Sequence, residues 1–146
     1  MKINEDICRY FQSKKGLREG DHLSSIMFNL IGDMLALLTE RAKKDGQIKG
    51  VVPHLVDNGL SNLQYADDII LFMHHNVDLA KNMKLLLCVF EQLSGLKINF
   101  FKSEVFCYGQ AKQFEQVYAQ LFGCGLGQYP FRYLGIPMHH KRLTGK

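Results

Sequence analysis

Two adjacent carboxylates, Asp67 and Asp68, are the residues of this chain best suited to do chemistry. They stand between two segments that we predict to be strands, 60–65 and 69–73, so a hairpin turn would hold both side chains close together. Neighbouring carboxylates repel each other, and a divalent cation removes that repulsion. Mg²⁺ prefers carboxylate oxygens and fills its other positions with water and phosphate oxygens. The pair predicts a metal-assisted phosphate-chemistry site or, alternatively, an ordinary polar turn that faces water.

We expect helices and short strands to hold this turn in place. Segment 23–44 predicts a helix because its apolar residues recur at steps of three and four, and Gly46 follows its end. Asp78 is the predicted N-cap of a second helix, which ends at Gly95. The other predicted elements are a helix over 111–122, a short strand and turn over 48–59, and strands over 96–99, 104–108 and 131–136. This order predicts an α+β fold, with helices packed on one face of a mainly antiparallel sheet.

The composition is that of one globular domain or a piece of a larger one. The chain has 146 residues, of which 47% are hydrophobic and 22% charged, and this balance excludes a disordered tail, a collagen-like repeat and a coiled-coil rod. The net charge of +4 is unevenly spread: residues 1–73 hold 9 basic and 10 acidic side chains, and residues 74–146 hold 9 basic and 4 acidic. The acids therefore gather in the first half, and the cations dominate the second.

The sequence shows none of the patterns expected of a secreted chain, a membrane span or a cysteine zinc site. The four cysteines have no C-x-x-C spacing, which argues against zinc or thioredoxin-type chemistry. No apolar leader opens the chain, and the longest apolar run, 26–38, is interrupted by polar residues. We therefore expect an intracellular chain, and nothing in the sequence indicates a specific protein partner.

The four residues Tyr65-Ala66-Asp67-Asp68 resemble the YxDD motif of reverse transcriptases. Three further segments are similar to the same family in the same order: G-L-R-E-G-D-H-L-S-S-I-M-F-N-L at 16–30, L-S-G-L-K-I-N followed by K-S-E at 93–104, and F-R-Y-L-G-I-P at 131–137. The resemblance extends from about residue 14 to the end of the chain. The particular residues of these segments resemble those of the LINE-type, non-LTR retrotransposon enzymes of plants.

The resemblance implies a polymerase palm that transfers nucleotides with two Mg²⁺ ions, using an RNA template, a DNA primer and dNTPs. It assigns Asp67 as a catalytic metal ligand, with Asp68 beside it near the primer end. It also implies that Lys102 neutralises or protonates the leaving pyrophosphate, although a solvated lysine is an equal alternative. The remaining implied contacts are to the nucleotide or template from Tyr65, Gly16, Arg18 and Gly20, and to the primer from Tyr133, Leu134 and Gly135.

One expected part of the palm has no counterpart in the sequence. The two-metal site needs a further carboxylate from a strand well upstream of Gly16, and Glu5 and Asp6 lie too close to that loop. We therefore expect residues 1–146 to form a partial reverse transcriptase domain. We expect this partial domain to consist of the palm subdomain, with the fingers largely missing and the first catalytic carboxylate strand and the thumb absent.

Local departures from the family pattern favour an inactive chain. Glu19 stands where the family has Gln, Ser25 where it has Pro, and Ile69 where a Thr usually follows the two aspartates. We expect the isolated chain to extend no primer. Two alternatives remain: a poorly folded relic with no selected role, or a non-catalytic, basic nucleic-acid-binding remnant. The cations of that second alternative would be Lys97, Lys102, Lys112, Arg132, Lys141 and Arg142.

Overall fold

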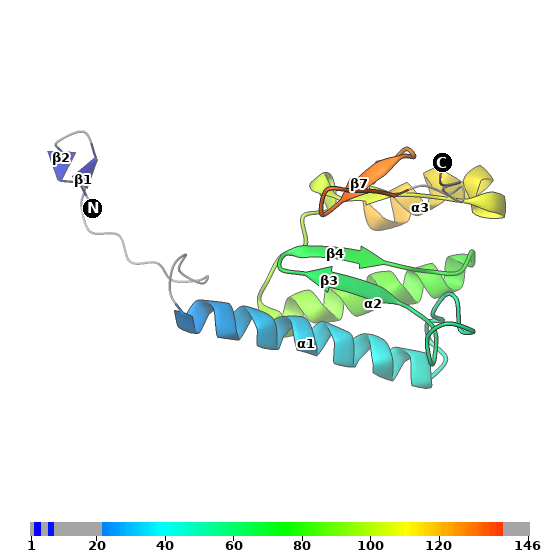
Figure 1. Cartoon of the computed structure of the whole chain (residues 1–146), viewed down its shortest axis with the longest axis horizontal. Helices are drawn as coiled ribbons and strands as arrows, with labels where there is room; N and C mark the ends of the chain where they lie inside the picture. The colour runs from blue at the N-terminus through cyan, green and yellow to red at the C-terminus, as the bar shows by residue number, and fades with distance from the viewer. Residues whose placement is uncertain (1, 4–5, 8–21, 139–146) are drawn as a thin grey trace, which may run out of the picture.

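The computed structural model describes residues 2–3, 6–7 and 22–138 (Figure 1). Gly16, Arg18 and Gly20 fall outside the described residues. The helices are α1 (His22–Lys44), α2 (Val77–Ser94) and α3 (Glu115–Phe122), with two 3₁₀ segments, η1 (Phe100–Lys102) and η2 (Gly109–Phe114). The strands are β1 (Lys2–Ile3), β2 (Asp6–Ile7), β3 (Asn62–Tyr65), β4 (Asp68–Leu71), β5 (Glu104–Val105), β6 (Gly125–Leu126), β7 (Phe131–Tyr133) and β8 (Ile136–Met138).

The long helix α1 confirms the prediction made from its periodicity. Its inward positions include Leu35, Thr39 and Ala42, all buried, and these follow one another at steps of four and three. The last turn of α1 carries three basic side chains, whose positive charges interact favourably with the negative end of the helix dipole. Gly46 then takes a positive φ of 70°, the backbone conformation that ends many helices.

The start of α2 corrects the predicted cap. Asn76, and not Asp78, is the N-cap: its side chain accepts hydrogen bonds from the backbone N of Asp78 at 2.8 Å and of Leu79 at 3.0 Å. Asn76 has the extended backbone that an N-cap needs, whereas Asp78 already lies inside the first turn. In that turn the Asp78 carboxylate interacts favourably with the positive end of the helix dipole and forms an ion pair with Lys81. The predicted C-terminal glycine is confirmed, because Gly95 has a φ of 72°.

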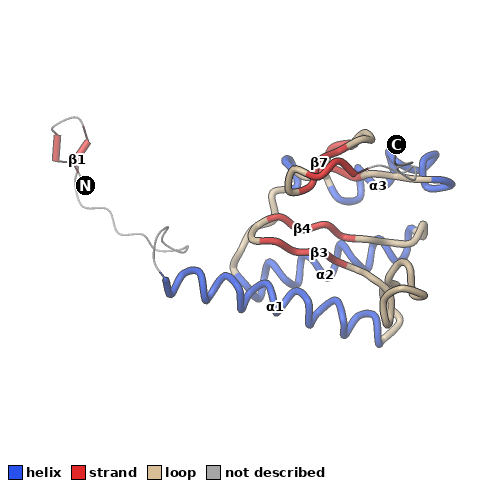
Figure 2. Tube along the Cα trace, viewed as in Figure 1, coloured by secondary structure: helices blue, strands red, loops and turns tan. Residues whose placement is uncertain are grey.

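The strands pair two by two. The pairs β1–β2, β3–β4 and β7–β8 are antiparallel, and β5–β6 is parallel. Helices α1 and α2 lie on the same side of the β3–β4 hairpin, and β7 lies on its other side (Figures 1 and 2). The fold is therefore α+β and mainly antiparallel, as predicted, although it is built from small hairpins.

Two predicted strands have a different form. Residues 96–99 form no strand, and the Ile98 N–H donates at 2.7 Å to the Glu91 carboxylate. Residues 131–136 form a hairpin in place of one strand, because Leu134 and Gly135 make a two-residue turn with φ of 50° and 80°. Pro137 lies inside β8 opposite Arg132, in a two-stranded unit where a missing N–H is tolerated.

The helix predicted over 111–122 is α-helical only from Glu115 to Phe122, because residues 109–114 form the 3₁₀ segment η2. The predicted strand and turn over 48–59 become an isolated antiparallel bridge between Val51 and Leu60. Asn58 and Gly59, at its turn, both have positive φ.

The core is centred on α2, which packs against both α1 and α3, and its most deeply buried large side chains are Leu35 of α1 and Met83 of α2. Tyr118 and Phe122 extend this core from α3. Leu71 packs against it from β4 and so fixes the hairpin to the helices. Among the described helices, none combines the length and apolar character needed to cross a membrane.

Candidate functional site

The two aspartates lie at the tip of the β3–β4 hairpin. Tyr65 pairs with Asp68, so Ala66 and Asp67 form a two-residue turn in which Ala66 has a φ of 51°. Both carboxylates are exposed, and within the described part of the chain neither has a hydrogen bond or an ion pair. Their oxygens are therefore available to an outside ligand.

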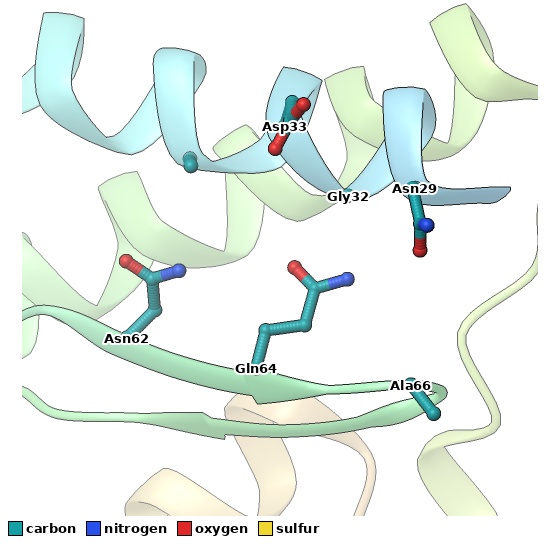
Figure 3. Close-up of a pocket in the computed structure, with 7 residues that line it drawn as sticks. Asn29, Gly32, Asp33, Asn62, Gln64 and Ala66 are labelled. Atoms are coloured by element: carbon teal, nitrogen blue, oxygen red, sulfur yellow. The ribbon is translucent and has the colours of Figure 1, made fainter. Parts of the chain in front are cut away.

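The two faces of this hairpin differ in their side chains. Cross-strand partners share a face, so Tyr65 and Asp68 lie together on one side, as do Leu63 and Ile70. The other face carries Asn62 and Gln64, whose amides point toward α1 (Figure 3). Tyr65 is 63% exposed, which leaves its ring open on the same face as Asp68.

A groove of about 320 Å³ separates α1 from β3 and ends at the turn residue Ala66. Its other lining residues are Asn29, Gly32, Asp33, Ala36, Asn62 and Gln64 (Figure 3). Gly32 makes room for Gln64: a Cβ at Gly32 would lie 2.4 Å from the Gln64 Nε2. The Asn62 Oδ1 is within hydrogen-bond range of the hydroxyls of Thr39, at 3.5 Å, and Ser61, at 3.3 Å. This polar layer joins the hairpin to α1.

The sequence patterns did not predict this groove. Its only signals were a glycine inside the α1 periodicity and polar residues at alternate positions of the 60–65 segment. Both signals are local, and the contact between them joins residues about thirty positions apart.

The other candidate residues lie on separate elements. Lys102 is exposed at the end of η1, where its backbone N donates at 3.2 Å to the Asn99 Oδ1. No hydrogen bond or ion pair joins its ammonium to Asp67 or Asp68 in the described part of the chain. Tyr133 ends β7, and Leu134 and Gly135 form the turn of the β7–β8 hairpin. The structure therefore places two candidate groups at the tips of two different hairpins.

A cluster of three aromatic rings, of which Phe106 and Phe131 are stacked, supports the β7–β8 hairpin. The Phe106 ring lies 4.1 Å from that of Phe131 and 5.7 Å from that of Tyr129, measured between centroids. Burial raises the pKa of Tyr129 above its ordinary value, with a smaller contribution from the nearby Cys107 thiol. A Cβ at Gly127 would lie 2.3 Å from the Phe106 ring, so only glycine fits against it.

The donor set at the β3–β4 tip suits Mg²⁺ in kind. Carboxylate oxygens are its preferred protein ligands, and it keeps several waters as the remaining ones. Among the described residues, however, no group of three or more His, Cys, Asp or Glu side chains could together hold a metal ion. Asp67 and Asp68 are the carboxylates that the described part of the chain presents at this tip.

A comparison with known protein families shows which family the chain belongs to. Residues 2–138 match the family model described as reverse transcriptase (RNA-dependent DNA polymerase). No solved structure matches the chain. Members of this family generally use divalent metal ions and bind a nucleic-acid template and primer together with dNTPs. The matched region includes the YxDD-like tip of β3–β4 and the β7–β8 hairpin, and the chain belongs to the reverse transcriptase family.

Proposed function

We propose that this chain is a partial palm of an RNA-directed DNA polymerase from a plant LINE-type, non-LTR retrotransposon. In this proposal residues 1–146 form part of the palm. The observation that carries the proposal is the tight turn that presents Asp67 and Asp68 beside an open Tyr65, with both carboxylates exposed and without an ion pair to any described residue. An ordinary surface turn would not need the four-residue pattern of the family.

The proposed roles follow from this placement. Asp67 and Asp68 hold Mg²⁺, which when bound would activate a primer hydroxyl and neutralise the nucleotide's phosphates. Tyr65 lies on the face of Asp68 and positions the nucleotide or the template–primer end. Lys102 provides a cation for the leaving pyrophosphate, and the turn at Leu134 and Gly135, preceded by Tyr133, contacts the primer. Gly16, Arg18 and Gly20 keep their proposed template and nucleotide contacts.

We infer that the isolated chain does not polymerise. Two adjacent carboxylates hold Mg²⁺ weakly, and two ions held side by side need a further anionic ligand. No third acidic group joins the pair in the described residues. Metal binding and polymerisation therefore separate in this chain: the first is expected to be weak and measurable, and the second to be absent.

Metal binding at the turn is tested with Mn²⁺, whose electron paramagnetic resonance signal reports the free ion. Weak binding should fall at least fivefold in Asp67→Asn, because a neutral amide replaces an anionic ligand. The matched control is Asp57→Asn, which changes another exposed turn aspartate and should leave Mn²⁺ binding as in the original chain. Equal binding by all three proteins would contradict a metal site at the tip.

Polymerisation is tested by primer extension on an RNA template with Mg²⁺ and dNTPs. We expect no product from the 146-residue chain. Nucleotide incorporation that disappears in Asp67→Ala would overturn the inferred inactivity while supporting the assignment of the turn. The two assays together therefore separate a wrong site from a wrong conclusion about activity.

Non-catalytic nucleic-acid binding is the second candidate function, and it rests on Lys102 and Arg132. Several other cations of the basic half have internal partners: Lys112 pairs with Glu115, Lys97 lies 3.9 Å from Glu91, and Lys84 lies over the Phe100 ring. Lys102 and Arg132 are exposed, without an ion pair in the described residues. Lys141 and Arg142 lie outside that part of the chain.

Filter binding to single-stranded RNA at several salt concentrations tests this second function. Two phosphate contacts give a slope of about −1.4 in a plot of log affinity against log salt for a single strand. Lys102→Ala should reduce that slope by about half. Binding without salt dependence would rule out phosphate contacts by these residues.

A further inference from the structure

An apolar patch covers the outer face of the two long helices, on the side away from the strands. We call it the outer helix patch, and its residues are Ile26, Met27, Leu30 and Leu37 of α1 and Leu85, Val89 and Leu93 of α2. Leu30 is 62% exposed and Leu37 is 70% exposed. Helix periodicity places both opposite the buried Leu35 and Thr39, on a different face from the residues that line the groove with β3. Solvent therefore covers residues of a type that usually fills a core.

The contributions of the two helices adjoin each other. The Asn82 side chain of α2 donates at 2.7 Å to the carbonyl of Gln47, which lies just beyond the end of α1. This flank of α2 therefore borders α1. Leu85, Val89 and Leu93 follow Asn82 at steps of three and four, so they continue along the same flank. The two stripes thus form one surface across the packed α1–α2 pair.

Charged side chains are scarce in this surface. Between Ile26 and Leu37, α1 contains only Asp33, which lines the groove with β3, and the α2 segment from 85 to 93 contains only Glu91. The Glu91 carboxylate accepts a hydrogen bond from the Ile98 N–H at 2.7 Å and lies 3.9 Å from the Lys97 ammonium, so it serves the loop after α2. Depletion of charge at the centre of a patch is typical of protein interfaces.

The area of the patch fits one half of a protein–protein interface. Its exposed fractions together equal about four fully exposed large apolar side chains, or about 400 Å² at roughly 100 Å² each. A standard interface buries about 800 Å² per partner, and somewhat more than half of that area is apolar. The patch therefore supplies nearly the apolar area that a stable pair of such surfaces requires.

We propose that the outer helix patch binds the same patch of a second copy of this chain, with the two α1 helices antiparallel. A two-fold pairing needs a surface that matches itself when reversed. The patch residues Met27, Leu30 and Leu37, together with the partly buried Met34 that lies between them on α1, follow one another at steps of three, four and three, which read the same in both directions. Met27 of one copy then meets Leu37 of the other, and Leu30 meets Met34. These steps are also those of helices that pack side by side.

Sedimentation velocity on the 146-residue chain, over a range of concentrations, tests this pairing. The chain should sediment as a reversible dimer, at twice the 16.7 kDa of one copy. The double variant Leu30→Glu and Leu37→Glu should weaken dimerisation at least a hundredfold, because it would bury four carboxylates in the interface. The matched control is Leu55→Glu, because Leu55 is 75% exposed and lies outside the patch, so this variant should dimerise like the original chain.

Circular dichroism of each variant shows whether the helices remain folded, and Leu85→Glu provides a second disruption from α2 if the double variant unfolds. Loss of the dimer with helical content intact supports the pairing. A chain that is monomeric at every concentration would overturn it. So would a dimer that survives both the α1 and the α2 variants, or polydisperse aggregates in place of a dimer.

Discussion

The β3–β4 and β7–β8 hairpins both have a two-residue turn, but only in β7–β8 does the second turn residue, Gly135, also have a positive φ. Each has a two-residue turn whose first residue is a non-glycine with positive φ, 51° at Ala66 and 50° at Leu134. One turn continues into Asp67 and Asp68, and the other into Gly135 and an apolar strand. A positive φ at the first turn residue therefore does not identify a functional site in this fold. The side chains that the turn presents carry the chemistry.

The supports beneath the two hairpins differ in rigidity. The β3–β4 hairpin meets α1 through amide side chains and the space above Gly32, and it joins the core through Leu71. The β7–β8 hairpin rests on the packed rings of Phe106, Tyr129 and Phe131. Amide side chains can rearrange at small cost, whereas packed rings cannot. We therefore expect equal substitutions beneath the two hairpins to have unequal effects.

Gly127→Ala should cause the largest effect, a loss of about 1–3 kcal/mol in the free energy of unfolding. The added Cβ would lie 2.3 Å from the Phe106 ring, and two neighbouring rings prevent that ring from moving aside. Urea unfolding measures this loss as a lower midpoint at constant slope. A variant as stable as the original chain would show that the aromatic cluster is loosely packed.

Gly32→Ala is the matched change beneath β3–β4. Its Cβ would lie 2.4 Å from the Gln64 Nε2, which is the far end of a flexible and exposed side chain. Gln64 can turn away, and alanine gains about 1 kcal/mol of helix propensity over glycine. The same urea measurement should therefore show no loss, or a gain of up to about 1 kcal/mol. A loss equal to that of Gly127→Ala would remove the distinction between the two supports.

Local patterns predicted the elements that local interactions determine. The α1 and α2 helices follow from apolar periodicity, and Gly46 and Gly95 end them as predicted. The choice of Asn76 over Asp78 as cap could not be predicted, because both side chains can cap and only the backbone angles at the helix start decide. The β7–β8 turn was missed because leucine rarely occupies a positive-φ position.

The candidate site was predictable as far as its sequence motif reaches. The pattern around Asp67 and Asp68 predicted both the strand–turn–strand arrangement and the family, and the structure and the family match confirm these two points. The groove with Gly32 and Gln64 could not be predicted, because it depends on how α1 packs against β3. The roles of Lys102, Tyr65 and the Tyr133–Leu134–Gly135 segment remain predictions.

Glycine in the two turns should produce a smaller effect of the opposite sign. Ala66→Gly removes the backbone strain of about 1–2 kcal/mol that a non-glycine residue typically has at positive φ. It also destabilises the folded chain by about 0.4–1 kcal/mol, because glycine raises the conformational entropy of the unfolded chain. The net expectation is a gain below about 1 kcal/mol, measured as a higher urea midpoint. Leu134→Gly should gain less, because it also removes a side chain that is half-buried. Destabilisation by Ala66→Gly alone would show that contacts with its methyl group hold the β3–β4 tip.

Alkaline pH should weaken the support of β7–β8 without any substitution. Burial is the main cause that raises the pKa of the Cys107 thiol above 9.0 and of the Tyr129 hydroxyl above 10.0, so the folded state favours the neutral forms. Their stabilising contribution is complete below these ordinary values and is lost as pH rises through them to the raised values of the folded chain. The urea midpoint should therefore be constant from pH 7 to 8 and fall above pH 9.

Cys107→Ala isolates the first part of this loss. Removing the thiol costs some packing at every pH, so the informative quantity is the change in the urea midpoint between pH 8 and pH 10. The urea midpoint should fall less in the variant than in the original chain, because the variant lacks a thiol that ionises more readily in the unfolded chain than in the folded one. Identical pH dependence in the two proteins would show that the thiol ionises as readily in the folded chain as in the unfolded one. The rings of Phe106, Tyr129 and Phe131 would then hold their hairpin independently of Cys107.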